Sequence, residues 1–154
     1  MARDVVQELA NEAIGAQTAI HDALLKFSEV GLAEERIKTA EIVYFALTLT
    51  ICSLFRWGHF SDATALADSL SDQVLRLNLE SNAIRSRSEA IKIYRIRFSE
   101  YRAALPRLTD DQVGFGLLLS KNITGEDDVL IGTVLCAVTA IILGELKNLI
   151  QDMC

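Results

Sequence analysis

Two long stretches of this 154-residue sequence contain no charged residue. They are the 14-residue run from Ile42 to Phe55 and the 16-residue run from Val129 to Gly144. Crossing a bilayer takes about 20 predominantly apolar residues, with a range of about 17–25, so both runs are too short. A helix that is apolar on every side has to be covered on every side. We therefore expect both runs to be interior helices of a folded domain, and we expect neither to span a membrane.

The composition indicates a single helical domain that covers residues 1–154. One proline and eight glycines are too few for an all-β fold with many tight turns. Hydrophobic residues make up 51% of the chain, which excludes a disordered acidic chain despite the net charge of −6. A domain of about 100–200 residues is the usual folding unit, so one chain-wide fold is expected.

Helical periodicity is visible on both sides of the first apolar run. From Asp4 to Phe27, apolar residues recur at steps of three and four and form one face of an amphipathic helix. A second helix is predicted from Ala33 to Trp57, amphipathic at its start and apolar on every side from Ile42 onward. This second helix should lie at the centre of the domain.

Shorter signals define the C-terminal third. Thr109 and Gln112 have the spacing of a capping box, which predicts a short helix from about Asp110 to Ser120. A last helix is expected to open with the acidic stretch 124–128, because negative charge is favoured in a first helical turn, and to run to about Asp152.

The middle of the chain lacks glycine and proline between His59 and Leu105. One seven-residue phase is apolar at every step, at Ala63, Leu70, Leu77, Ile84, Ile91, Phe98 and Leu105. An ordinary loop has no reason to preserve such a register. The pattern therefore predicts one helix of roughly 40 residues, or two nearly collinear helices that meet near Asn78–Asn82. The expected fold is an all-α bundle of five or six helices with this long amphipathic element.

Basic residues are concentrated between residues 85 and 107. The segment carries seven of them against two acids, so it is +5 and the rest of the chain is −11. The basic face consists of Arg85, Lys92, Arg95, Arg97, Arg102 and Arg107, together with Arg87. We expect this face to meet the acidic surface of the same chain or of a second copy. A less favoured alternative is nucleic-acid binding, with the rings of Tyr94 and Tyr101 stacking on bases.

Arg87 stands in the middle of the apolar stripe, where a guanidinium needs a partner or must extend to solvent. Glu80 is one candidate partner, across an antiparallel pairing of two such helices. The carboxylate or phosphate of a ligand is another. The second functional hypothesis is therefore a bundle that binds a small apolar or acidic ligand near Arg87, Tyr94 and Tyr101.

Small residues recur every four positions in the last helix, at Gly132, Cys136, Ala140 and Gly144. Such a ridge lets another helix backbone approach closely. We expect it to serve close packing within the bundle, with a dimer seam as the alternative.

Signals for catalysis, metals and cofactors are weak. The histidines, His21 and His59, lie in separate segments with no nucleophile or metal ligand at a suitable spacing, and the three cysteines form no motif. We predict no metal and no cofactor, and do not favour an enzyme. Acids and glutamine near the N-terminus are untypical of a secretory signal, so a cytoplasmic location is expected. The leading hypothesis is a non-enzymatic helical interaction or assembly module with a protein partner, most simply another copy of itself.

Overall fold

The computed structural model describes residues 4–26 and 33–154, and within these ranges it contains α-helices and no strand. The seven α-helices are α1 (Val5–Lys26), α2 (Thr39–Trp57), α3 (Ala63–Glu80), α4 (Arg87–Ala104), α5 (Arg107–Asp110), α6 (Gln112–Thr124) and α7 (Val129–Met153), with a short 3-10 turn, η2 (Glu34–Arg36). The predicted all-α bundle is confirmed, although the described part holds seven helices rather than five or six. Phe27, the last residue of the predicted first helix, lies outside the described residues.

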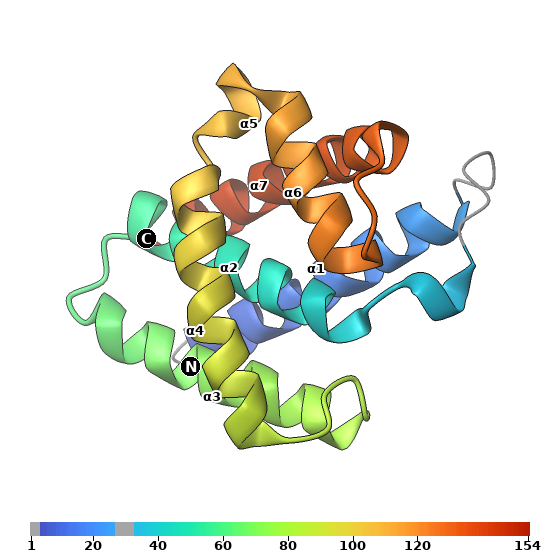
Figure 1. Cartoon of the computed structure of the whole chain (residues 1–154). Helices are drawn as coiled ribbons and strands as arrows, with labels where there is room; N and C mark the ends of the chain where they lie inside the picture. The colour runs from blue at the N-terminus through green and yellow to red at the C-terminus, as the bar shows by residue number, and fades with distance from the viewer. Residues whose placement is uncertain (1–3, 27–32) are drawn as a thin grey trace.

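Helix α2 crosses the middle of the molecule, as Figure 1 shows. Every residue from Glu41 to Ile51 is buried, which confirms the interior position predicted for this run. The other long helices, α1, α3, α4 and α7, all pack against it. Because α2 is apolar on every side, it offers each neighbour a surface that is stable only when covered.

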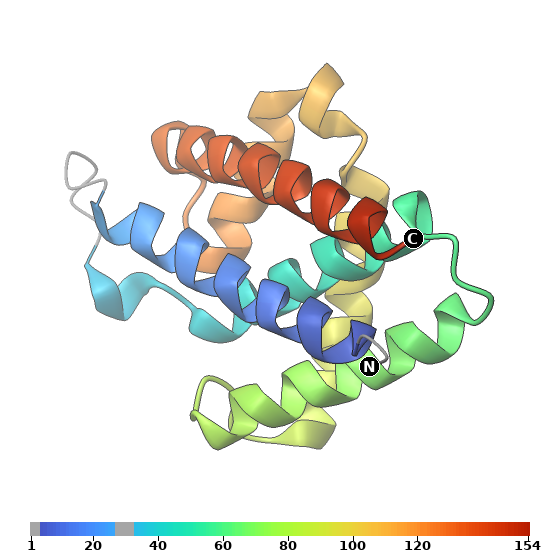
Figure 2. The same ribbon diagram turned by 180° about the vertical axis from the view of Figure 1, so that it is seen from behind.

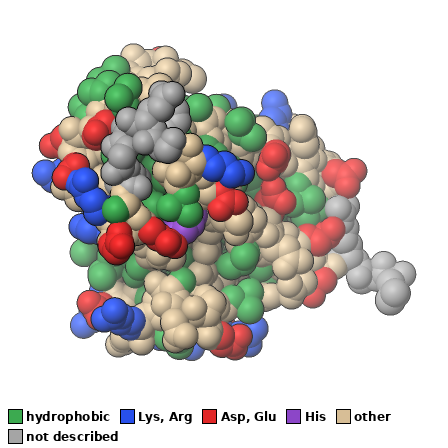
Figure 3. Space-filling model, turned by 90° about the vertical axis from the view of Figure 1, so that its right-hand side faces the viewer, with side chains coloured by type: hydrophobic (Ala, Val, Ile, Leu, Met, Phe, Trp, Pro, Cys, Tyr) green, Lys and Arg blue, Asp and Glu red, His purple; other side chains and the backbone are tan. Residues whose placement is uncertain are grey.

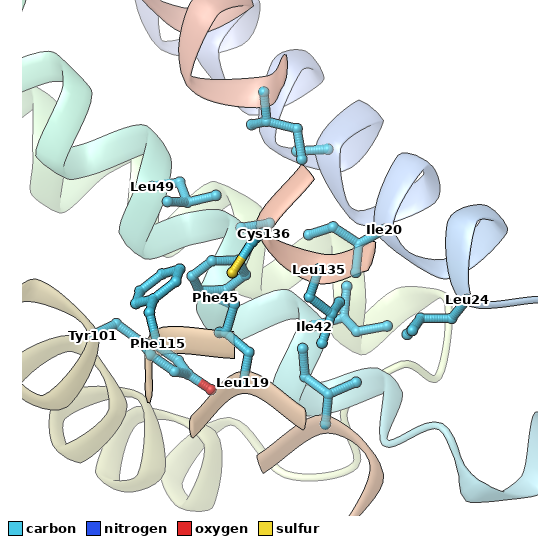
Figure 4. Packing of buried hydrophobic residues seen from close by; sticks show 14 of the residues in the cluster. Ile20, Leu24, Ile42, Phe45, Leu49, Tyr101, Phe115, Leu119, Leu135 and Cys136 are labelled. Atoms are coloured by element: carbon cyan, nitrogen blue, oxygen red, sulfur yellow. The ribbon is translucent and has the colours of Figure 1, made fainter. Parts of the chain in front are cut away.

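Two hydrophobic clusters lie around α2. One joins the C-terminal half of α1 to α6 and α7, and the aromatic residues Phe45, Tyr101 and Phe115 lie together within it (Figure 4). The rings of Phe45 and Tyr101 meet edge to face with their centroids 5.0 Å apart, a favourable aromatic geometry. The other cluster joins the N-terminal half of α1 to α3 and α4. The chain therefore has a core on both sides of its central helix.

The long amphipathic helix predicted between residues 61 and 105 is not formed. Helix α3 ends at Glu80, α4 begins at Arg87, and the two meet at an angle in Figure 1 rather than continuing one another. In the turn, Asn82 adopts a left-handed φ of 64°, which asparagine tolerates better than most residues. The turn brings Arg87 back to Asp72 of α3, with which it forms an ion pair. The break is close to the predicted position, but the collinear arrangement is wrong.

The helix starts near the C-terminus also differ from prediction. Asp111, rather than Thr109, caps α6 by accepting a hydrogen bond from the Gly114 backbone N–H at 3.0 Å. Thr109 instead donates its hydroxyl to the Pro106 carbonyl, so no capping box forms. Helix α7 begins only at Val129, because Gly125 ends α6 in a left-handed conformation and the acidic residues that follow form the connection.

Candidate interaction surface on α7

Two helices, α2 and α7, are long and apolar enough to cross a membrane by length and composition alone. In α2, 72% of the apolar window is buried inside the protein, which is the behaviour of a core helix. In α7, the more apolar of the two, only 39% of the window is buried. The interior position predicted for the run Val129 to Gly144 is therefore wrong, because α7 exposes a large part of its surface.

Exposed and half-buried residues of α7 form a continuous uncharged stripe, here called the outer face of α7. It consists of Leu130, Thr133, Val134, Ala137, Ala140, Ile141 and Gly144, of which Thr133 is polar. Leu130 and Ile141 are 57% and 62% exposed, whereas Val134 is half-buried. No charged residue occurs on α7 before Glu145, so the stripe carries no charge over four turns. Figure 2 shows α7 lying along the surface for its whole length, beside α1.

The predicted ridge of small residues is divided between two sides of α7. Gly132 and Cys136 face α6, and a Cβ atom built on Gly132 would lie 2.7 Å from the Gly116 carbonyl carbon. Ala140 and Gly144 are exposed, and a Cβ atom on Gly144 would meet nothing within 4 Å. At 3.6 residues per turn, a four-residue spacing advances about 40° around the helix at each step. Four such residues therefore cannot all face one neighbour.

The structure does not bring the predicted ligand-binding residues together. Arg87 is exposed and pairs with Asp72, while Glu80 is exposed at the end of α3. Tyr94 packs in the cluster beside α3, its ring 6.4 Å from that of Tyr44, and Tyr101 packs in the opposite cluster. These four side chains do not form a common pocket.

The basic face is partly neutralised within the chain. Arg87, Arg97 and Arg107 form ion pairs with Asp72, Glu41 and Asp111 respectively. The remaining basic residues of the segment are exposed and have no ion pair with a described residue: Arg85, Lys92, Arg95 and Arg102. On the side of the molecule seen in Figure 3, acidic and basic side chains are interspersed rather than separated by sign.

The sequence pattern does not predict a polar cluster that lies between α2, α4 and α6. Arg97 Nε donates to Glu41 Oε2 at 2.7 Å, and the two side chains are only 24% and 12% exposed. Asn122 Nδ2 donates to Glu100 Oε1 at 2.6 Å and to the Tyr101 hydroxyl at 3.2 Å. The hydrogen bond to Glu41 raises the pKa of Arg97. One signal was present, since Glu41 directly precedes the apolar run and so had to enter the interior with it.

Among the described residues, no three histidine, cysteine or acidic side chains gather as a metal site. His21 Nε2 lies 4.0 Å from a Glu34 carboxylate oxygen on an open surface. His59 lies elsewhere, with its backbone N–H 3.4 Å from the Cys154 Sγ atom. The histidines thus stay apart, as their positions in the sequence predict.

Comparisons with protein-family models, with curated proteins and with solved structures found no match. The most unusual feature of the molecular surface is the uncharged outer face of α7.

Proposed function

We propose that the protein is a helical interaction module that self-associates through the outer face of α7. The observation that carries this proposal is the exposure of Leu130 and Ile141 on a helix face without charge. Soluble proteins rarely leave large contiguous apolar patches open, and such patches commonly mark interaction sites. Covering the face removes apolar surface from water, which is the main driving force of protein association.

The spacing of the outer face favours another α-helix as its partner. Its apolar positions at Leu130, Val134, Ala137, Ile141 and Gly144 alternate in steps of four and three, the repeat on which two helices pack side by side. The absence of side-chain bulk at Ala137 and Gly144 lets a partner backbone come close. The outer face of α7 runs from Leu130 to Gly144, so it offers a seam about 21 Å long.

Helix α7 of a second copy of this chain is the simplest partner for the outer face. Most soluble oligomers are symmetric homo-oligomers, in which one self-complementary patch meets its own copy. Apolar stripes meet this requirement because they need no opposite charge on the partner. The polar residues Glu145, Lys147 and Asn148 at the C-terminal end of the stripe would form the rim that such interfaces usually have. A homo-oligomer in the cytoplasm is thus the form in which we propose the protein acts.

Matched substitutions of two exposed isoleucines test the proposal. Ile141 on α7 and Ile96 on α4 are 62% and 61% exposed, so glutamate at either position disturbs the monomer to a similar degree. Light scattering should give an oligomer mass for the unmodified protein and for Ile96→Glu, and a monomer mass for Ile141→Glu, in both low and high salt. Equal masses for the two variants would contradict the proposal. Binding of Ile96→Glu but not Ile141→Glu to lipid vesicles, with both proteins monomeric, would assign the face to a membrane instead.

A further inference from the structure

A groove opens on the side of the molecule where α2, α4, α5 and α7 come together. Its volume is about 890 Å³, within the range of about 300–1,000 Å³ that holds small molecules. Its apolar wall is made by Phe98 of α4, Leu105 in the connection to α5, Leu108 of α5 and Leu143 of α7. The groove shares no residue with the outer face of α7, so ligand binding there does not depend on self-association.

Two guanidinium groups lie at this groove. Arg56 of α2 and Arg102 of α4 both line it, both are exposed, and neither forms an ion pair with a described residue. The Arg56 guanidinium carbon sits 4.9 Å from the centre of the Trp57 ring, which orients this side chain by a cation–π contact. Lys147 Nζ lies 5.9 Å from the centre of the same ring and adds to the positive charge.

A buried hydroxyl in the lining lacks a hydrogen bond. The Ser53 side chain is buried, and its Oγ has no partner among the described residues. Other hydroxyls of α2 are satisfied within the helix, since Thr48 and Thr50 donate to carbonyls four residues earlier at 2.7 and 2.8 Å. An unpaired buried hydroxyl is unfavourable, and this one lies directly behind the wall of the groove.

The charges in the lining determine how a ligand would lie. Asp110 on α5 is the acidic residue of the lining and would repel an anion. Arg56 lies on α2 and Arg102 lies on α4. Burial raises the pKa of the Cys52 thiol, and the positive charge of Arg102 acts in the opposite direction. An anionic group therefore belongs beside α2 and α4, with an apolar tail along the wall formed by Phe98, Leu105, Leu108 and Leu143.

We propose that this groove binds a single-chain amphiphile with an anionic head, such as an alkyl carboxylate, with the head on Arg56 and Arg102. Guanidinium groups pair with carboxylates and phosphates through charge-assisted hydrogen bonds. The volume of about 890 Å³ lies in the range of small-molecule sites and suits one alkyl chain. Alkyl carboxylates and alkyl phosphates share the required chemistry, and the experiment separates them.

The fluorescence of Trp57 reports directly on the groove, because Trp57 is part of the lining and is the single tryptophan of the chain. Titration with dodecanoate below its micellar concentration should give a saturable change in tryptophan fluorescence and a raised melting temperature. Dodecyl phosphate tests the second head group, and dodecyltrimethylammonium, with the same tail and opposite charge, should not bind. Tighter binding of dodecyl phosphate than of dodecanoate would assign the natural ligand to the phosphate class.

Variants locate the binding site. Arg102→Gln should weaken dodecanoate binding at least about tenfold, the loss expected for one charge-assisted hydrogen bond. The matched control Arg85→Gln removes an exposed arginine of the same basic segment outside the groove and should leave affinity unchanged. Asp110→Asn should tighten binding, because it removes the repulsion of the head group.

Protection of a cysteine gives a readout that does not depend on fluorescence. Bound dodecanoate should slow maleimide labelling of Cys52 in the groove and leave the exposed Cys154 unaffected. The proposal is overturned if dodecanoate neither changes the fluorescence nor protects Cys52. It is equally overturned if the cationic amphiphile binds as well as dodecanoate, or if Arg102→Gln and Arg85→Gln have the same affinity.

Discussion

The backbones of Gly116 in α6 and Gly132 in α7 are in direct contact. A Cβ atom on Gly116 would lie 2.8 Å from the Gly132 carbonyl oxygen, and one on Gly132 would lie 2.7 Å from the Gly116 carbonyl carbon. These two positions have no space for any side chain. The contact holds the short helix α6 tightly against α7, and this explains why each of these helical positions is occupied by glycine despite its low helix propensity.

Alanine at this contact should therefore destabilise the fold. We expect Gly116→Ala to lower the free energy of unfolding by about 1–3 kcal/mol, because the two helices have to move apart. The control is Gly15→Ala in α1, where a Cβ atom would meet nothing within 4 Å, so the gain in helix propensity should stabilise by up to about 1 kcal/mol. Urea denaturation of both variants measures the difference. Two changes of the same sign would argue against a close helix crossing.

The ion pair between Glu41 and Arg97 should matter more than exposed pairs. Glu41→Gln removes the charged acceptor at 2.7 Å and leaves the partly buried Arg97 guanidinium with only the Glu100 carboxylate at 3.9 Å, and we expect a loss of about 1–3 kcal/mol in the free energy of unfolding. Arg87→Gln removes the exposed pair with Asp72 and should cost less than about 1 kcal/mol. Chemical denaturation at pH 7 compares the two variants. A larger loss for Arg87→Gln would show that the buried cluster does not fix α4 against α2.

The three tyrosines, Tyr44, Tyr94 and Tyr101, should resist ionisation in the folded protein. Burial raises the pKa of each phenol above its usual value of about 10. The neutral phenol is favoured in the folded state, so its contribution to stability is complete below pH 10 and is lost as the pH rises beyond that value. Ultraviolet titration should show tyrosinate only together with alkaline unfolding, whereas in urea all three should titrate near pH 10. Ionisation near pH 10 without unfolding would contradict the buried positions.

Asp111 should contribute to acid sensitivity. Its hydrogen bond with Arg107, and then the one from the Gly114 N–H, hold the pKa of its carboxyl below the usual value. Because the folded-state pKa is lowered, the contribution is present above the unfolded pKa of about 3.9 and is lost as the pH falls through the folded value. Asp111→Asn should therefore be less stable than the unmodified protein at pH 7, and the two should converge below about pH 4. A difference that persists in acid would point to a cause other than charge.

The sequence predicts the helices of this fold better than their arrangement. The central position of α2 agrees with the run Ile42 to Phe55, because a helix without a charged side is stable when its neighbours cover it, but the same argument applied to Val129 to Gly144 is wrong for α7, which lies at the surface. The fold-back between Glu80 and Arg87 could not be deduced from the heptad phase. Both α3 and α4 pack an apolar face against α2. The seven-residue spacing of apolar residues therefore continues through the turn, although the direction of the helix axis changes there.

The candidate surfaces depend on tertiary structure in the same way. An apolar run such as Val129 to Gly144 does not reveal which of its sides the neighbouring helices will cover. The groove is assembled from four helices, and its residues, Arg56 and Arg102 among them, are distant in sequence. The pairing of Arg97 with Glu41 likewise joins positions 56 residues apart. Periodicity describes one helix at a time, and these features arise between helices.

Sedimentation equilibrium of the unmodified protein tests the central claim most directly. If the outer face of α7 is a self-association surface, the apparent mass should rise with concentration above the 17.0 kDa of one chain. The association should be no weaker at high salt than at low salt, because it depends on apolar surface rather than on charge. A mass of 17.0 kDa at every concentration and salt level would contradict the claim.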